Sequence, residues 1–418
     1  MKRDRLKESV DLIREVFYYT ARFKNETFVF QIENSIIESD NFHSLIKDLS
    51  MLKKSGINIV IIPGAHDHID RILKQYNIDI KSNNGIRIST PETIPFIKMA
   101  AFDVANKIMT SLSRSKIPAV IGNWVHARGK GVIDGIDYQE TGVVDKIYKD
   151  PLFKVISDDL VPIFPCIGWN SMGKPYNISS RELASSISKT LKSSKLFFIG
   201  QHSKLSGISR MDLKTASNYN GELQGLVKLA VDACQNGVKR VHIIDGRTEG
   251  VILKEIFSNT GQGTMIHSND YEKIRPMKSS DIIDVINLMK PFIEEGILIK
   301  RTEDQFKDIL DDYVLYEIDK KIHACGALHL HDDGIGEIAG LASDPTSKAM
   351  GSGKAIVDYL IEKGRDQGAK EIFVLTTRTS DWFESIGFKK GSLEDLPLWK
   401  REKYNQERNS RIFIRKIN

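Results

Sequence analysis

The sequence is poor in cysteine, and it contains neither a long apolar run nor a block of like charges. Its 418 residues include only three cysteines, Cys166, Cys234 and Cys325, which lie far apart and match no metal-ligand spacing. This argues against a disulfide framework and against a metal site. No apolar run is long enough to span a bilayer. The net charge of +5 comes from interspersed lysines, arginines and acidic residues, so nucleic-acid binding is not indicated.

The chain is long enough for two domains, and its composition is that of a globular protein. Hydrophobic residues make up 41% of it and charged residues 28%. The first 15 residues are charged and amphipathic and lack the apolar core of a signal peptide. We therefore expect a cytoplasmic protein that binds no membrane.

Strand-like and helix-like segments alternate through the first part of the chain. Short apolar runs predict strands at 27–32, 58–65, 117–122, 161–165, 196–199 and 240–246. Apolar residues at helical spacing predict helices at 6–23, 67–75 and 183–191. The run at 58–65 is apolar on both faces, which is typical of a parallel strand covered by helices. An α/β fold with a largely parallel sheet follows.

A polar run at 268–272 is the best candidate for a linker, and it predicts domains at 1–268 and 273–418. The second domain is expected to contain a strand at 274–278, a helix at 281–289, a hairpin at 313–318 and 322–328, and strands at 336–345 and 371–377.

A glycine-bearing turn follows the strand at 336–345 and opens a helix. The N–H groups at a helix N-terminus favour an anion, and Gly351 and Gly353 let the backbone approach a ligand closely. Taken alone, such a turn is more often only a turn. The pattern Lys348-x-x-Gly351-x-Gly353, with the later Trp382-Phe383-x-x-x-Gly387-Phe388, resembles the acyl-CoA site of the GNAT acetyltransferases.

In this family the loop begins with glutamine or arginine, and the lysine here keeps a charge but loses a planar fork. The resemblance implies an acetyl-CoA site formed by Leu341, Ala342, Ser343, Lys348, Met350, Gly351, Ser352, Gly353 and Lys354.

Residues 6–268 resemble the amino-acid kinase fold in its acetylglutamate branch, most clearly at 14–19, 85–89, 242–247 and 255–266. Kinases of that branch carry Lys-x-Gly-Gly after the first strand, where this chain has Gln31-Ile32-Glu33-Asn34. The cation and both glycines are missing, and Glu33 would repel a triphosphate. We infer a kinase-inactive regulatory domain.

Together the two parts, with the tail at 404–410, resemble the two-domain bacterial N-acetylglutamate synthases. The expected fold is a three-layer amino-acid-kinase domain with a mainly parallel sheet, followed by a GNAT α/β domain. The resemblance implies acetyl transfer from acetyl-CoA to the α-amino group of L-glutamate, the first step of arginine biosynthesis. It also implies feedback inhibition by L-arginine and a homo-oligomer, with a hexamer suggested.

The acetyl transfer needs a base, because the amine of glutamate is protonated at neutral pH. Glu337 matches the general base of the family, and Thr376 matches a hydroxyl position that serves the leaving thiolate. Backbone N–H groups near Gly340 and Leu341 are the expected oxyanion donors, and Gly340 stands where close relatives often have cysteine.

Glutamate carries two carboxylates, which bidentate arginines hold best. The resemblance assigns them to Arg301, Arg408 and the Ser410 hydroxyl, with Lys300 and Arg378 as weaker candidates.

Binding of arginine is expected in the first domain, at Tyr19, His242, Glu255, Gly261 and Gly263, with the helix at 6–23 closing over the ligand. Two alternatives remain open at this point. The first is a non-catalytic sensor of arginine and acyl-CoA, and the second is a GNAT enzyme that acetylates an amine other than glutamate.

Overall fold

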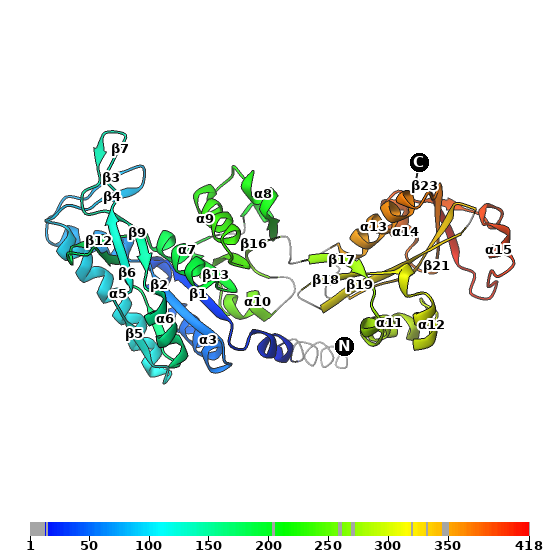
Figure 1. The fold of residues 1–418 in the computed structure, drawn as a ribbon, viewed down its shortest axis with the longest axis horizontal. Helices are drawn as coiled ribbons and strands as arrows, with labels where there is room; N and C mark the ends of the chain where they lie inside the picture. Colours follow the sequence, from blue (N-terminus) through cyan, green and yellow to red (C-terminus); the bar gives the residue numbers. More distant parts are fainter. Residues whose placement is uncertain are drawn as a thin grey trace. The chain divides into compact units, whose positions relative to one another are not determined.

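The computed structural model describes residue 13 and residues 16–202, 205–257, 261–268, 272–318, 321–331, 333–344 and 351–417. The chain divides into two compact units, Met1–Asn269 and Asp270–Asn418, each with its own sheet and core (Figure 1).

An eight-stranded sheet forms the centre of the first unit, in the order β14-β16-β15-β13-β1-β2-β10-β5. Every neighbouring pair is parallel except β15 and β16. The mainly parallel sheet that the sequence predicts is confirmed. Its strands are β1 (Thr27–Ile32), β2 (Asn58–Pro63), β5 (Ala119–Ile121), β10 (Val161–Ile163), β13 (Lys195–Gly200), β14 (Arg210–Asp212), β15 (Arg240–Asp245) and β16 (Thr264–His267).

Helices cover both faces of this sheet and give the unit three layers. One core lies under α3, α4, α5 and α10, and the other lies under α6, α7 and α9. The helices are α2 (Asn34–Ile37), α3 (Phe42–Lys54), α4 (His66–Gln75), α5 (Ile94–Arg114), α6 (Lys149–Ser157), α7 (Ser180–Leu191), α8 (Leu213–Ser217), α9 (Gln224–Gln235) and α10 (Val251–Phe257).

Several strands of the first unit escaped prediction because they are only two or three residues long or, as at 125–129 and 142–147, because glycine and charged residues interrupt the apolar pattern. A four-stranded sheet has the order β12-β11-β6-β9, and β3 pairs with β4 and β7 with β8. Their bounds are β3 (Lys81–Asn83), β4 (Ile86–Ile88), β6 (Val125–Gly129), β7 (Val132–Ile133), β8 (Ile136–Asp137), β9 (Gly142–Ile147), β11 (Ile167–Trp169) and β12 (Pro175–Asn177).

The expected N-terminal helix is described at residue 13 and from residue 16 onward, and residues 16–23 are helical. The apolar residues that predicted this helix do not form a buried face in the single chain, since Ile13 and Phe17 are 53% and 73% exposed. Tyr19 and Phe23 are the residues of this segment that are buried.

A seven-stranded sheet organises the second unit, in the order β17-β18-β19-β20-β21-β23-β22. Only β20 and β21 run parallel to each other. The strands are β17 (Glu272–Pro276), β18 (Tyr313–Ile318), β19 (Lys321–Leu330), β20 (Ile335–Ser343), β21 (Glu371–Thr376), β22 (Lys389–Gly391) and β23 (Arg411–Lys416).

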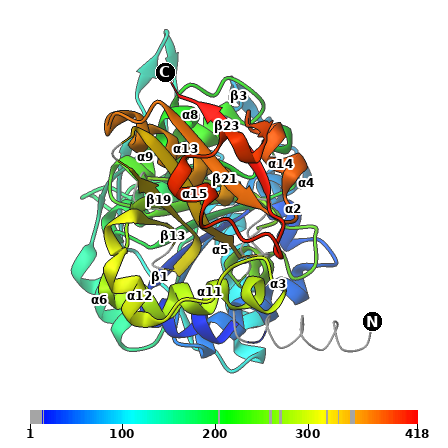
Figure 2. The same ribbon diagram turned by 90° about the vertical axis from the view of Figure 1, so that its right-hand side faces the viewer.

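Helices again lie on both sides of the second sheet (Figure 2). One core contains residues of α11 (Ile282–Glu294) and α12 (Glu303–Asp308), and the other contains residues of α13 (Ser352–Asp366) and α14 (Ser380–Ser385). The four-residue helix α15 (Leu398–Arg401) precedes the last strand.

The pairing of β20 changes partway along its length. It pairs with β21 only from Ile335 to Ile338, whereas its pairing with β19 continues to Ser343. The part of β20 that no longer pairs with β21 contains two irregularities. One is a register shift against β19, and the other is Gly340, whose φ of 59° is left-handed. The two parallel strands therefore separate at the middle of the sheet.

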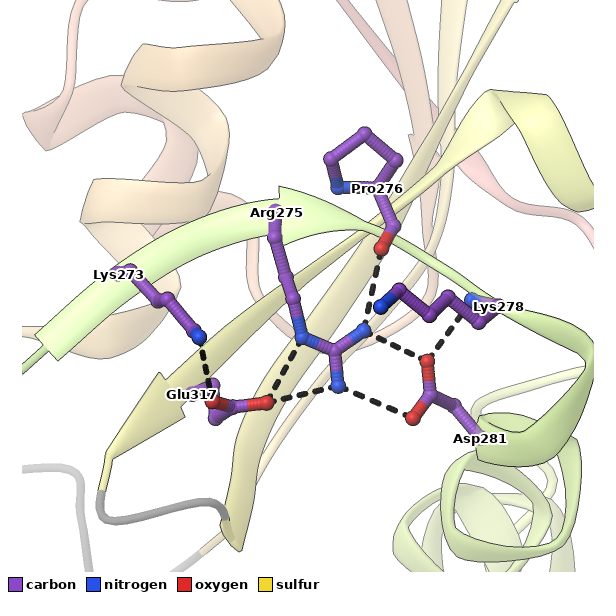
Figure 3. A network of polar contacts seen from close by, with 6 residues as sticks. All are labelled: Lys273, Arg275, Pro276, Lys278, Asp281 and Glu317. Carbon is purple, nitrogen blue, oxygen red and sulfur yellow. Dashed lines mark hydrogen bonds and ion pairs between the residues drawn. The ribbon is translucent and has the colours of Figure 1, made fainter.

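One polar network fastens the first strand of this unit to its first helix (Figure 3). The Arg275 guanidinium donates to both Asp281 oxygens, at 2.6 and 3.0 Å, and to Glu317 at 2.7 Å. Lys273 contacts the other oxygen of Glu317 at 3.1 Å. The hydrogen bond from Arg275 lowers the pKa of Asp281, and Arg275 and Lys273 lower the pKa of Glu317 against the effect of burial.

Candidate functional site

Glu337 lies on β20 one residue before the two parallel strands separate. Its side chain is 11% exposed, and both carboxylate oxygens accept from Lys400 Nζ, at 2.6 and 2.5 Å. Lys400 comes from α15, and its ammonium also lies 5.9 Å from the centre of the Phe373 ring on β21. The expected base is thus held by a single long, flexible side chain.

The segment after Glu337 turns away from β21 at Gly340 and continues through Leu341, Ala342 and Ser343. Ala342 is buried, while Leu341 and Ser343 are half-buried. A bent strand that has lost one neighbour can present backbone groups to a ligand, which suits the predicted oxyanion donors.

The glycine turn is described from Gly351 onward, and the expected contacts Lys348 and Met350 lie outside the described residues. Gly351 is the N-cap of α13 with φ of 69°, and Ser352 is buried. A Cβ at Gly353 would lie 3.7 Å from Trp382, so the helix start packs on that ring. Lys354 pairs with Asp358 along the helix surface at 2.5 Å.

Thr376 ends β21 and is buried. Its hydroxyl lies 2.7 Å from the Thr379 hydroxyl and accepts from the Thr379 N–H at 3.2 Å. The hydroxyl stabilises the turn into α14, and its role toward a leaving thiolate stays a prediction.

The loop at residues 295–301, between α11 and α12, carries two of the predicted glutamate-binding residues and is contacted by two others. Arg378 pairs with Glu295 at 3.0 Å, and Arg408 donates to the carbonyl of Ile297. The same loop carries Lys300, which is exposed, and Arg301.

The C-terminal tail is tied down beside this loop. Tyr404 donates to the Ser410 carbonyl at 2.6 Å, and the Ser410 residue is buried. Segments more than 100 positions apart in the sequence therefore meet, since Arg408 and Ile297 are separated by 111 positions.

The predicted effector residues of the first unit also converge. Glu255 on α10 is 7% exposed and accepts from His242 Nδ1 at 2.6 Å and from the N–H groups of Gln262 and Gly263, at 2.6 and 3.0 Å. Burial opposes ionisation of Glu255, but these hydrogen bonds outweigh it and lower its pKa to about 2. A Cβ at Gly263 would overlap Ile243, so this loop needs its glycine.

Lys195 is the residue of this cluster that the sequence analysis missed. Its Nζ lies 3.2 Å from His242 Nε2 and 5.1 Å from the centre of the Phe23 ring, on which Tyr19 stacks. The ionised carboxylate of Glu255 can only accept, so Nδ1 of His242 carries the hydrogen of that bond, and Nε2 accepts from Lys195. Burial lowers the pKa of Lys195 and lowers that of His242 to about 4.

A cavity of about 450 Å³ lies in the first unit where β1 and β2 end. Glu33 lines it, pairs with Arg181 and lies 3.5 Å from His202. The carboxylate that the sequence places after the first strand therefore does enter this cavity.

No described helix is long and apolar enough to cross a membrane. Within the same residues, no group of three or more His, Cys, Asp or Glu side chains is arranged to hold a metal ion.

Comparison with known proteins relates both units to established families. Residues 33–245 match the amino acid kinase family, and residues 282–388 match the acetyltransferase (GNAT) family. The chain is 30% identical to an amino-acid acetyltransferase of Mannheimia succiniciproducens, over 98% of each chain. It is 29% identical to that of Yersinia pseudotuberculosis, over 99% of each.

Solved structures of N-acetylglutamate synthase from Neisseria gonorrhoeae are similar over 98% of this chain and 99% of theirs, at 28% identity. The TM-score is 0.85 for its complex with coenzyme A and L-arginine, and 0.63 for its complex with coenzyme A and N-acetylglutamate.

Proposed function

Because this chain belongs to the family of two-domain, acetyl-CoA-dependent amino-acid acetyltransferases, we propose that its acceptor is L-glutamate and its product N-acetyl-L-glutamate. This reaction opens the biosynthesis of arginine. The observation that carries the proposal is that the loop bearing Arg301 is also contacted by Arg378 and Arg408, in the same unit as buried Glu337.

The proposed chemistry begins at the ammonium of glutamate. Glu337 removes a proton from it, directly or through water, and the resulting amine attacks the thioester carbonyl. Backbone N–H groups at the bend of β20 stabilise the oxyanion. Its collapse breaks the carbon–sulfur bond, and the second proton of the nitrogen passes to the departing thiolate, directly or through water, to give the amide and free coenzyme A. Lys400 holds Glu337 in the absence of substrate and must yield to let the proton transfer occur.

The arginines supply what a dicarboxylate needs. Arg408 and Arg301 each offer a planar fork that fits a carboxylate, and Arg408 is oriented by the Ile297 carbonyl. Lys300 is exposed on the same loop and serves at most as an additional point charge.

For the first unit we propose that free L-arginine is the ligand and an inhibitor of synthesis. Glu255 is a fixed anion that can pair with a guanidinium or an ammonium, and the ammonium of Lys195 suits the carboxylate of an amino acid. Glu33 beside Arg181 disfavours a nucleotide triphosphate in the neighbouring cavity.

We further propose that the N-terminal helix packs against another copy of the chain in a homo-oligomer. Ile13, Val16 and Phe17 are exposed, and an apolar pocket of about 340 Å³ lies beside Val16, lined also by Met51 and Phe257. Sedimentation analysis of the wild type against Phe17→Ser tests this, and an unchanged mass would remove the support.

The decisive experiment measures release of coenzyme A from acetyl-CoA with a panel of amino acids, with and without arginine. Release that depends on glutamate and falls with arginine is expected. Binding of both ligands without release would favour the non-catalytic sensor. Release with another amine but not with glutamate would favour the second alternative.

A further inference from the structure

Tyr313 is a fully buried tyrosine whose hydroxyl faces the proposed substrate arginine. It begins β18, its ring packs edge-to-face on Phe306 with centres 5.3 Å apart, and it is 0% exposed. Its hydroxyl oxygen accepts a hydrogen bond from Arg301 Nη1 at 2.7 Å. A buried hydroxyl is costly unless it is paired, and Arg301 supplies the partner.

The same hydroxyl fills the space beside Gly340. A Cβ built at Gly340 would overlap the Tyr313 hydroxyl and would lie 3.0 and 3.2 Å from the ring atoms Cζ and Cε1. Gly340 has φ of 59° and lies at the bend where β20 leaves β21. One oxygen atom therefore contacts both the bend of β20 and the loop that carries Arg301.

We propose that Tyr313 is a positioning residue for glutamate, which holds the Arg301 guanidinium in place from the bend at Gly340. The inference rests on the proposed function. A long arginine side chain loses rotamer freedom when it binds a carboxylate, and a hydrogen bond that already fixes it reduces that loss. Burial raises the pKa of the Tyr313 hydroxyl, so it stays neutral and keeps a lone pair for Arg301.

This contact explains why residue 340 is a glycine. The hydroxyl occupies the volume that any larger residue at residue 340 would need. Tyrosine at residue 313 and glycine at residue 340 are therefore a matched pair, and a change at one should alter the effect of a change at the other.

The first test is Tyr313→Phe, assayed by coenzyme A release. We expect the apparent KM for glutamate to rise about 10-fold, while the KM for acetyl-CoA and the kcat change little. The control is Tyr316→Phe, which removes a hydroxyl from a buried tyrosine in the core on the other face of the same sheet and should leave the KM for glutamate unchanged.

The second test distinguishes two roles of the Tyr313 hydroxyl, its packing against residue 340 and its hydrogen bond to Arg301. It measures the temperature of half-inactivation. Gly340→Ala forces a methyl group onto the hydroxyl and should lower that temperature by about 5 °C. In Tyr313→Phe/Gly340→Ala the overlap with the oxygen is removed, whereas the close ring carbons and the left-handed φ at residue 340 remain. Part of the loss should therefore return, while the KM for glutamate stays raised because Arg301 has lost its partner.

A KM for glutamate that Tyr313→Phe leaves unchanged would overturn the proposal, as would a fall in kcat alone. Effects of the two substitutions that simply add would contradict the contact between the hydroxyl and residue 340. A wild-type protein without glutamate-dependent release would instead refute the proposed function, and this outcome is distinguishable because it needs no variant.

Discussion

The two units each contain a buried glutamate at a functional cluster, and the two carboxylates are held in different ways. Glu255 is fixed by donors that cannot move independently, two backbone N–H groups and an imidazole stacked on Phe197. Glu337 is held by one lysine at the end of a four-carbon side chain. Taken over the whole residue, their exposures are 7% and 8%, so burial alone does not distinguish them.

The difference in partners suits Glu255 to binding a ligand and Glu337 to exchanging a proton. Glu255 has its pKa lowered to about 2 by fixed hydrogen bonds, which makes it a permanent anion. A base must instead lose its partner when the substrate arrives, and a flexible ammonium is a partner that can leave. The surroundings of the two glutamates thus support an effector site in the first unit and catalysis in the second.

The largest expected effect comes from Glu337→Gln, which keeps the shape and removes the proton acceptor. The rate should fall by roughly 10²–10⁴-fold with little change in acetyl-CoA binding, since a general base contributes about that much. Steady-state release of coenzyme A and calorimetric titration with acetyl-CoA measure the two quantities.

The matched control is Glu371→Gln on the neighbouring strand β21, which should retain the activity. If Glu337→Gln is as active as this control, the base lies elsewhere and the comparison of the two carboxylates fails.

The next effect is expected in the first unit, where Glu255→Gln removes the fixed anion. Affinity for arginine should fall by about 100-fold, because a buried charge pair is lost, while synthesis without arginine continues. Titration with arginine, together with the inhibition curve, tests this. Tight binding of Mg-ATP by the wild type without binding of arginine would refute the assignment of this site.

A smaller effect is expected from Arg408→Lys, which keeps the charge and loses the fork. The apparent KM for glutamate should rise about 10-fold, and that for acetyl-CoA much less. Lys300→Met on the adjacent loop is the control, since an exposed lysine should matter less. Equal effects of Arg408→Lys on both substrates would mean that the tail is only structural.

The sequence predicted the elements whose pattern is local, and it missed contacts made across the fold. The long strands β1, β2 and β15 were found from apolar runs, whereas two- and three-residue strands such as β7 and β11 carry too little pattern. The family resemblance led to Glu337, and to Glu255 together with its partners His242 and Gly263, but not to Lys195 or Lys400.

Lys195 does carry a signal, because a lysine at the start of the run Leu196-Phe197-Phe198-Ile199 is out of place in a buried strand. Lys400 lies in a polar segment without any such contrast, and only the fold brings it to Glu337, 63 positions away. The role of Tyr313 likewise depends on Gly340, a residue on another strand.

The smallest expected effect concerns stability in acid, and it compares the two units directly. The pKa of His242 is lowered from 6.5 to about 4 by burial and by Lys195, so the unfolded chain binds a proton that the folded unit refuses. This lowers the stability of the first unit as the pH drops from 6.5 toward 4, and protonation of Asp48, whose pKa burial raises to about 6, offsets part of the loss below pH 6. The pKa of Glu255 is lowered from 4.5 to about 2, so stability should fall further as the pH drops below 4.5.

In the second unit the lowered carboxyl pKa values belong to Asp281, Asp304, Glu317 and Asp395, whose ordinary values are 3.8 for aspartate and 4.5 for glutamate, so its loss begins only below about pH 4.5. Buried Cys234 and Cys325 report on the two units separately through pulse labelling with a methanethiosulfonate in urea. Between pH 6.5 and 5 the urea midpoint of Cys234 should fall, by on the order of 0.5 M, while that of Cys325 stays constant. His242→Gln should abolish the fall in the urea midpoint of Cys234 in this range. A midpoint that still falls with pH would assign the acid sensitivity to another group.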